Sequence, residues 1–321
     1  MLNEPIRIGT LTLKNRLVMP PMHTGLTDAG HVTDALVEYY HDRAAFSAPG
    51  LIIMEHCAVA ADGRASDTQL LLSDDGMIAE HRRLTEAIHA GGSRAIAQLN
   101  HAGSNGIDAP VSASAVVNPR AQEQRFPRAL TPEEMARIGD AYVAAARRAM
   151  QAGYDGVELH CAHAYLFNQF YSPLTNHRED AYGGSLENRL RFLLETYEKV
   201  RAALGDDVPV AVRLGGADYL PGGSTEEDAV AAALLLEAAG VDLIDLSGGM
   251  CGFVLRDHPE AGYFGSMSEK VRRAVHTPVL LTGGVQTVAD AERLLAEGKA
   301  DLIGVGRALF KNARWRETAQ A

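Results

Sequence analysis

The chain has 321 residues, a formal net charge of −11 at pH 7 and an apolar fraction of 46%. The acidic balance argues against general nucleic-acid binding, because no basic excess is available to replace phosphate counterions. No apolar run approaches the ~20 residues that span a bilayer, and no secretory signal is visible, so we expect a cytoplasmic protein without a membrane partner. Cys57, Cys161 and Cys251 lie far apart, which indicates buried thiols rather than disulfides or a metal centre.

Short β-branched segments alternate with longer amphipathic segments along the chain. The expected strands are Leu17–Met19, Leu51–Met54, Arg94–Gln98, Gly156–His160, Val208–Arg213, Asp242–Leu246, Pro278–Thr282 and Asp301–Gly304. Helices are expected over Asp34–Ser47, Pro132–Ala152, Leu186–Leu204, Glu226–Ala239, Glu269–Val275 and Val288–Glu297. Near-continuous apolar strands between helices indicate a parallel sheet covered on its outer face. Eight such units predict an α/β protein with a closed (β/α)₈ TIM barrel.

Local signals support these helix boundaries. The run Thr131-Pro132-Glu133-Glu134 combines an N-cap, a first-turn proline and acidic residues near the positive helix end. Four glycines follow helices as left-handed caps do: Gly153, Gly205, Gly240 and Gly298.

The chain is expected to form one domain over residues 1–321, because no linker or low-complexity stretch interrupts the series. The segment Ala102–Arg128 lacks a helical period, and Tyr165–Gly184 is a second irregular stretch. Both are expected to be loop excursions over the C-terminal face of the barrel. In barrel enzymes this face carries the chemistry.

Glycines follow the last two expected strands. Gly283 and Gly284 end the seventh strand, and Gly306 with Arg307 ends the eighth. Exposed backbone N–H groups, the start of the following helix and a guanidinium together predict a phosphate-binding site. A tight turn would explain either glycine cluster alone, but two clusters on adjacent strands beside an arginine favour phosphate.

Two histidines and a tyrosine follow the fourth expected strand. His160 and His163 can direct two N–H donors at one oxygen and so stabilise developing negative charge. Tyr165 can deliver a proton, because a phenol keeps its proton at neutral pH. Two alternatives stay open: ordinary hydrogen-bonded histidines at the barrel mouth, and a zinc site. The only candidate third ligand is Glu158, which is expected to point into the barrel wall.

Six motifs resemble those of the Old Yellow Enzyme family. They are Asn15–Met22, Gln98–Gly103, His160-x-x-His163-x-Tyr165-Leu166, Asn176–Ser185, Asn188–Phe192 and Gly304-x-Gly306-Arg307, in the expected order over almost the whole chain. The run Met22–Leu26 is most similar to the barrel domain of bacterial 2,4-dienoyl-CoA and 2-enoate reductases. In those relatives a cysteine-rich iron–sulfur segment and a flavin domain follow. No cysteine follows Cys251, so we expect a stand-alone barrel.

The resemblance implies FMN as cofactor, with NADH or NADPH as reductant. The backbone of Pro20, Pro21, Met22 and His23 would line the isoalloxazine ring, with His23 or Thr24 near its O4/N5 edge. His56 stands where the family usually has a small residue close to the flavin. Gln98 would bind the pyrimidine end, Arg213 would lie near N1/O2, and Gly283, Gly284, Gly306 and Arg307 would hold the phosphate.

The implied activity is ping-pong hydride transfer to the C=C bond of an α,β-unsaturated carbonyl or nitro compound. His160 and His163 would bind the activating group, Tyr165 would donate the proton and Thr24 would contact the substrate. The loop Cys251–Phe264 is expected to cover the mouth and to select substrates, and family habit suggests a homo-oligomer. Three alternatives remain: a flavin-dependent amine demethylase or dehydrogenase, a non-redox phosphate-ligand-binding barrel, and a zinc hydrolase.

Overall fold

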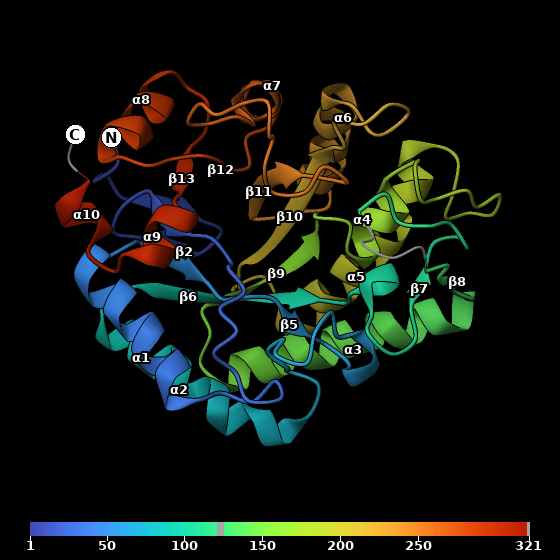
Figure 1. Cartoon of the computed structure of the whole chain (residues 1–321), viewed down its shortest axis with the longest axis horizontal. Helices are drawn as coiled ribbons and strands as arrows, with labels where there is room; N and C mark the ends of the chain where they lie inside the picture. Colours follow the sequence, from blue (N-terminus) through green and yellow to red (C-terminus); the bar gives the residue numbers. More distant parts are fainter. Residues whose placement is uncertain (121–124, 320–321) are drawn as a thin grey trace.

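Eight parallel strands close into a barrel in the computed structural model, which describes residues 1–120 and 125–319 (Figure 1). They are β3 (Leu17–Met19), β4 (Leu51–Ile53), β6 (Arg94–Asn100), β9 (Gly156–Cys161), β10 (Val210–Ala217), β11 (Leu243–Gly248), β12 (Val279–Thr282) and β13 (Leu302–Gly304). The barrel closes because β4 pairs with both β3 and β6. The predicted (β/α)₈ fold is confirmed, and each expected strand is present within a few residues of its expected bounds.

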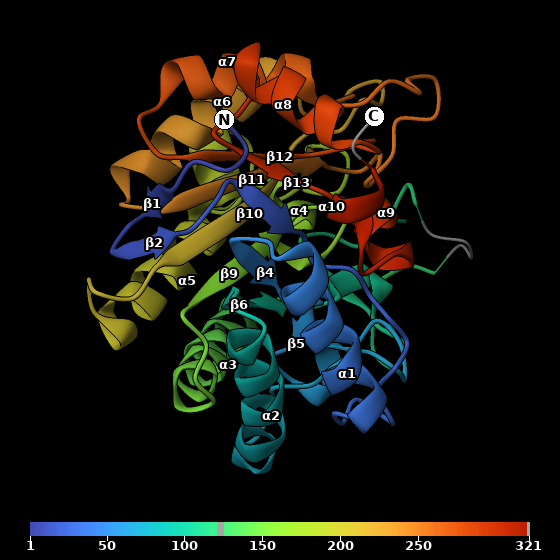
Figure 2. The same ribbon diagram turned by 90° about the vertical axis from the view of Figure 1, so that its left-hand side faces the viewer.

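Helices surround the barrel, with α1, α2 and α3 on one side and α6, α7 and α8 on the opposite side (Figure 2). Their bounds are α1 (Asp34–Asp42), α2 (Ile78–Ala90), α3 (Pro132–Gln151), α4 (Leu166–Tyr171), α5 (Leu186–Leu204), α6 (Glu226–Ala238), α7 (Gly265–Ala274), α8 (Val288–Ala296), α9 (Arg307–Lys311) and α10 (Trp315–Thr318). None of the described helices is long and apolar enough to cross a bilayer.

The predicted helix ends are largely confirmed. Thr131 and Glu134 form a capping box at the start of α3, and all four predicted glycine caps have positive φ. The expected helix over Asp34–Ser47 changes its winding, because α1 ends at Asp42 and Arg43–Ser47 forms a π-helix. Helix α7 begins four residues earlier than expected, at Gly265. The glycine and serine residues of its first turns weaken the helical pattern of apolar residues in the sequence.

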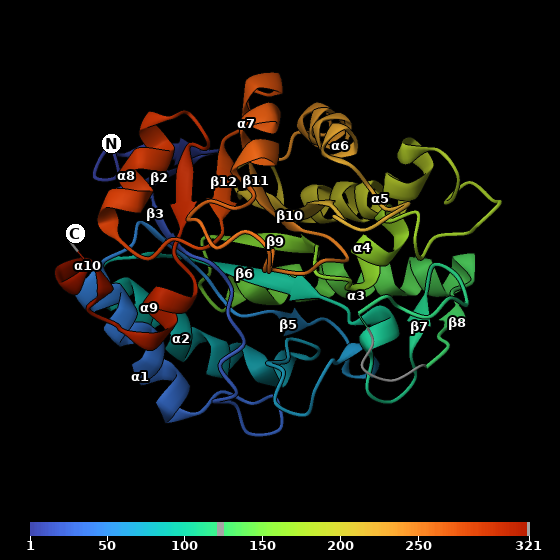
Figure 3. The same cartoon turned by 45° about the horizontal axis from the view of Figure 1, so that its top comes forward.

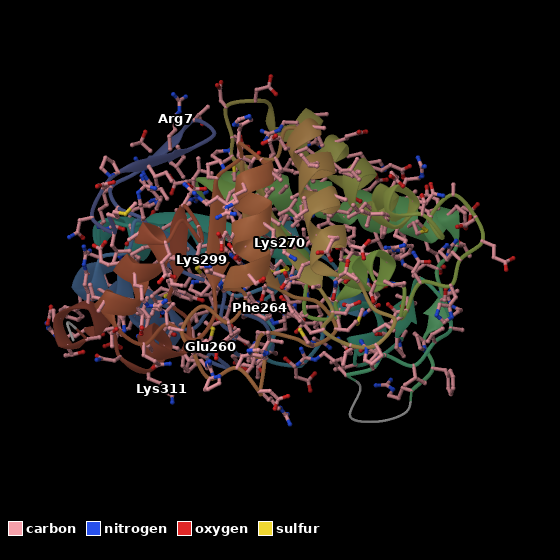
Figure 4. All side chains as sticks on the ribbon, turned by 90° about the horizontal axis from the view of Figure 1, so that it is seen from above. Arg7, Glu260, Phe264, Lys270, Lys299 and Lys311 are labelled. Atoms are coloured by element: carbon pink, nitrogen blue, oxygen red, sulfur yellow. The ribbon has the colours of Figure 1, made fainter. Side chains whose placement is uncertain are left out.

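An antiparallel hairpin that the sequence did not reveal closes the N-terminal end of the barrel. Its strands are β1 (Ile6–Ile8) and β2 (Leu11–Leu13). Ile8 and Leu13 belong to one cluster of buried side chains with residues of the barrel strands: Val18, Leu51, Ile53, Ile96, Ala211, Leu243, Leu280 and Leu302. In Figure 4, Arg7 on this hairpin lies on the side of the molecule opposite Glu260 and Lys311.

Both predicted excursions extend from the C-terminal ends of strands. The first contains β7 (Val111–Ser112), which pairs with β8 (Arg128–Ala129); its residues 121–124 lie outside the described residues. The second contains helix α4, which packs against the segment that carries β7 (Figure 3). All six residues of α4 are buried, so the helix has no amphipathic period for the sequence to display.

Candidate active site

A cavity of about 390 Å³ lies at the C-terminal ends of the barrel strands. Nearly all of the predicted site residues line it: Pro20, Pro21, Met22, His23, His56, Gln98, His160, His163, Tyr165, Arg213, Gly283, Gly284, Gly306 and Arg307. The exception is Thr24, which does not line the cavity. The predicted residues that line the cavity therefore come from seven of the eight barrel strands or the segments that follow them.

Seven further residues line the cavity and were not assigned from the sequence: Asn105, Arg120, Phe253, Tyr263, Thr282, Val285 and Gln286. Phe253 and Tyr263 belong to the loop that was expected to cover the mouth. Arg120 lies in the first excursion, with its guanidinium carbon 5.9 Å from the centre of the Phe253 ring. No motif marks Asn105 or Arg120, because the excursion has no regular pattern to place them.

The end of the cavity that is predicted to bind phosphate is lined by glycine backbone and by the cationic side chain of Arg307. Gly284 has φ +70°, and a Cβ atom there would lie 2.9 Å from the carbonyl oxygen of Glu260 and 3.0 Å from the Tyr263 ring. A Cβ atom at Gly283 would meet the same ring at 2.9 Å. Helix α9 has only five residues, so the positive charge here comes chiefly from Arg307 rather than from a helix dipole.

Two of the cavity-lining side chains, Arg213 and Gln98, contact buried carboxyl groups. The Nε atom of Arg213 is 3.1 Å from Asp245 Oδ2, although the two groups are not aligned for a hydrogen bond. Gln98 Nε2 donates to Glu158 Oε1 at 2.8 Å. Burial, followed by the nearby charge of Asp245, raises the pKa of Glu158 to about 8. Glu158 lies inside the barrel as expected, where it fixes the amide of Gln98.

These residues fit FMN. Because its Nε2 donates to Glu158, Gln98 has its Oε1 free of partners among the described residues, and this acceptor suits the N3–H group of a flavin. Arg213 is a buried cation that would suit the negative charge of a reduced flavin ring, and Arg307 with the glycines would suit a phosphate. The cavity thus matches both ends of the cofactor.

Thr24 lies outside the cavity because it is bound to a buried carboxylate. Both its backbone N–H and its Oγ1 donate to Glu55, each at 2.8 Å. His23 Nδ1 lies 3.6 Å from the same carboxylate. Burial raises the pKa of Glu55 to about 7, although the Thr24 hydrogen bonds lower it. Thr24 therefore positions Glu55 and His23, and the expected substrate contact of Thr24 remains a prediction without support from the cavity.

His160, His163 and Tyr165 form one cluster of rings. The ring centre of His160 lies 5.1 Å from that of His163 and 5.0 Å from that of Tyr165. His160 Nδ1 accepts the backbone N–H of Ala162 at 3.2 Å, so the ring proton is on Nε2. His163 Nε2 lies 2.7 Å from Ser247 Oγ, a contact that the sequence did not indicate.

Electrostatics keep all three groups in the protonation state that the prediction requires. Burial, followed by the charge of Arg213, lowers the pKa values of His160 and His163 well below 6.5, so both imidazoles are neutral. Burial raises the pKa of Tyr165 to about 12, although Arg120 lowers it. The tyrosine therefore keeps a transferable proton at neutral pH.

A strained turn places this cluster. His163 and Ala164 have φ values of +58° and +62°, which non-glycine residues rarely adopt. Asn168 Oδ1 accepts the backbone N–H of Ala164 at 2.8 Å. The backbone carbonyl of Ala164 accepts hydrogen bonds from Gln169 Nε2 at 2.6 Å and from Asn105 Nδ2 at 2.9 Å. Asn118 Nδ2 also donates to the carbonyl of Ala164, at 3.3 Å. These four amide side chains hold the turn, and sequence reasoning did not single out any of them.

A zinc site has no support in the described ranges 1–120 and 125–319. No group of three histidine, cysteine, aspartate or glutamate side chains is arranged to hold a metal ion there. The two histidines instead face a cavity with a neighbouring phenol.

Comparison with known proteins identifies the family. The model of the "NADH:flavin oxidoreductase / NADH oxidase family" matches residues 1–321. The chain is 38% identical to an NADPH dehydrogenase from Geobacillus sp. over 98% of its own length and 92% of that protein. An Old Yellow Enzyme homologue from Zymomonas mobilis superposes with a TM-score of 0.84 at 32% identity, covering 97% of this chain and 90% of the other.

A third relative is longer than this chain. It is an NADH oxidase from Thermoanaerobacter brockii, 38% identical over 98% of this chain, and the chain spans 50% of its length. The match over the whole chain and the superposition over nearly all of it show the family and the fold. The protein belongs to the NADH:flavin oxidoreductase family of Old Yellow Enzyme barrels, whose cofactors are FMN and NADH or NADPH.

Proposed function

We propose that the protein uses NADH or NADPH to reduce the C=C bond of alkenes activated by a carbonyl or nitro group. The observation that carries the proposal is the cluster of His160, His163 and Tyr165 in the same cavity as the residues that fit FMN. Two neutral imidazoles and a protonated phenol are the groups that conjugate reduction of such an alkene needs.

In the proposed reaction, FMN and the two histidines have separate roles. FMN, when bound, supplies hydride transfer from the nicotinamide to the substrate. His160 donates Nε2–H to the oxygen of the activating group. His163 can donate from Nδ1, provided that the Ser247 hydroxyl donates to its Nε2. Two donors at this oxygen stabilise the negative charge that develops there as the β-carbon is reduced.

Tyr165 completes the reaction by protonating the α-carbon. Its ring lies beside His160, and its pKa of about 12 keeps the proton on the phenol until a strongly basic carbon forms.

Replacing Tyr165 by phenylalanine tests the proposal. In stopped-flow experiments, Tyr165→Phe should reduce an enone roughly 10²–10⁴-fold more slowly, while bleaching of the flavin by NADPH stays near the wild-type rate. Tyr182→Phe is the matched control, because that phenol bonds to Glu195 outside the cavity. Equal loss of both half-reactions in Tyr165→Phe, or unchanged enone reduction, contradicts the assigned role.

An amine demethylase or dehydrogenase remains the second candidate on this fold. The buried phenol favours alkene reduction, because oxidation of an amine needs no proton donor at carbon. Flavin bleaching by an N-methyl amine in the absence of NADPH, without turnover of an enone, would favour the second candidate.

A further inference from the structure

His56 is a buried side chain at the cavity wall for which the proposed reaction has no role. It lies between β4 and the short strand β5 (Cys57–Ala58) and is only 9% exposed. Its ring centre is 5.2 Å from that of Tyr165 and 6.4 Å from that of His160. The imidazole therefore borders the part of the cavity where the substrate is proposed to bind.

One nitrogen of His56 is fully engaged with amide groups. Gln69 Nε2 and Asn100 Nδ2 each lie 3.1 Å from Nδ1. Both amides are completely buried, one in the loop after β5 and the other at the end of β6. An amide nitrogen can only donate, so Nδ1 has to be the acceptor and cannot carry a proton.

The orientation of the Gln69 amide is fixed by the backbone. Gln69 Oε1 accepts the N–H of Ala65 at 2.6 Å, and a backbone N–H can only donate. Turning the Gln69 amide over would place two donors against each other, so its nitrogen has to face His56. The proton of the neutral His56 ring is therefore on Nε2.

The Nε2–H group has no hydrogen-bond partner within residues 1–120 and 125–319, and the side chain lines the cavity. Burial, followed by the charges of His23 and Arg213, lowers the pKa of His56 to about 3. The ring stays neutral at ordinary pH, so the same single donor is presented throughout.

We propose that His56 is a third hydrogen-bond donor of the substrate pocket, locked in its Nε2–H form by Gln69, and that it selects alkenes with a second acceptor group. The inference rests on the proposed alkene reduction. His160 and His163 bind the first activating oxygen, and His56 binds the second acceptor group of the substrate. The favoured substrate class is an alkene flanked by two carbonyl or carboxylate groups.

Nuclear magnetic resonance tests whether His56 is held in its Nε2–H form, and it requires no turnover. In the FMN-loaded protein with ¹⁵N-labelled histidine, two-bond proton–nitrogen correlations distinguish Nε2–H, Nδ1–H and doubly protonated rings. The signal that disappears in His56→Phe belongs to His56, and we expect the Nε2–H pattern at pH 7. Either of the other two patterns overturns the proposal.

A variant at Gln69 tests the cause of the lock. In Gln69→Leu the Asn100 amide is free to turn, and its oxygen can then accept a proton from Nδ1. We expect the Nδ1–H pattern to become populated in this variant. Retention of pure Nε2–H would show that Gln69 does not set the tautomer.

Kinetics test the selectivity with ketoisophorone, which has a carbonyl on each side of its C=C bond, and 2-methylcyclohexenone, which has one carbonyl. In His56→Phe, the ratio of kcat/KM for ketoisophorone to that for 2-methylcyclohexenone should fall about tenfold, the effect of one lost hydrogen bond. His56→Gln, which keeps a donor of similar reach, should restore part of the ratio. A ratio unchanged in His56→Phe overturns the proposal.

The two proposals fail in distinguishable ways. If the wild-type protein reduces neither compound, the proposed alkene reduction is wrong, whereas the tautomer experiment still tests the lock. If the wild-type protein reduces both compounds and the ratio of kcat/KM values is the same in His56→Phe, the proposed alkene reduction is supported and the role of His56 in selectivity is wrong.

Discussion

Replacing the buried Glu55 by glutamine should change how the stability of the protein depends on pH. Burial raises the pKa of this carboxyl from 4.5 to about 7, against the opposing effect of two hydrogen bonds from Thr24. A raised pKa means that the folded chain holds the proton more tightly than the unfolded chain does. The stabilising contribution of this proton is therefore complete below pH 4.5 and is lost as the pH rises through about 7.

The size of the effect follows from the two pKa values. The difference between 4.5 and about 7 corresponds to roughly 3 kcal/mol of unfolding free energy. Glu55→Gln removes this titration, while other ionisable groups contribute equally to both proteins. Relative to wild type, the variant should therefore gain about 3 kcal/mol between pH 4.5 and pH 8.

Urea unfolding followed by circular dichroism measures this difference at several pH values. Glu86→Gln is the control, because Glu86 is exposed on α2 and its replacement should show no comparable trend. If the difference between wild type and Glu55→Gln stays constant within about 0.5 kcal/mol over this range, the reasoning from burial is wrong.

Two further substitutions test the remaining parts of the cavity. Arg213→Met should lower the unfolding free energy by about 3–5 kcal/mol, because it leaves Asp245 buried without its cation. In urea unfolding, the double variant that also carries Asp245→Asn should recover most of this loss. No recovery would refute the pairing of Arg213 with Asp245. Gly284→Ala should weaken FMN binding at least tenfold in fluorescence titrations, since the new Cβ meets the carbonyl oxygen of Glu260 in a left-handed residue. Gly205→Ala shares the positive φ in open space away from the cavity, so equal FMN loss there would implicate backbone strain instead.

The barrel could be predicted because its signals are local. Apolar strands, capping threonines and left-handed glycines each lie within a few residues of the feature they specify. The hairpin Ile6–Leu13 was missed because three-residue strands show too little alternation. Helix α4 was missed because burial on every side removes the helical period.

The candidate site was predictable where topology places residues, and not where distant contacts orient them. Parallel strands bring their carboxyl ends together, so the strand-end residues could be assigned in advance. The excursion that carries Arg120 has no periodic pattern. The tautomer of His56 depends on Gln69, thirteen residues away in the chain, and on the backbone N–H of Ala65. Such relations become visible only in three dimensions.

The turn at His163 and Ala164 explains how one short segment supplies three cavity side chains. Its two left-handed residues bring Tyr165, at the start of α4, back beside His160, at the end of β9. Each unfavourable φ costs about 1–3 kcal/mol. The amide hydrogen bonds to Ala164 from Asn168, Gln169 and Asn105 offset this cost at about 1 kcal/mol each. A glycine at this position would remove the strain, but it would also let the turn relax in the absence of substrate. The hydrogen-bond donors of His160 and His163 are therefore kept rigid by the amide side chains that contact the strained Ala164.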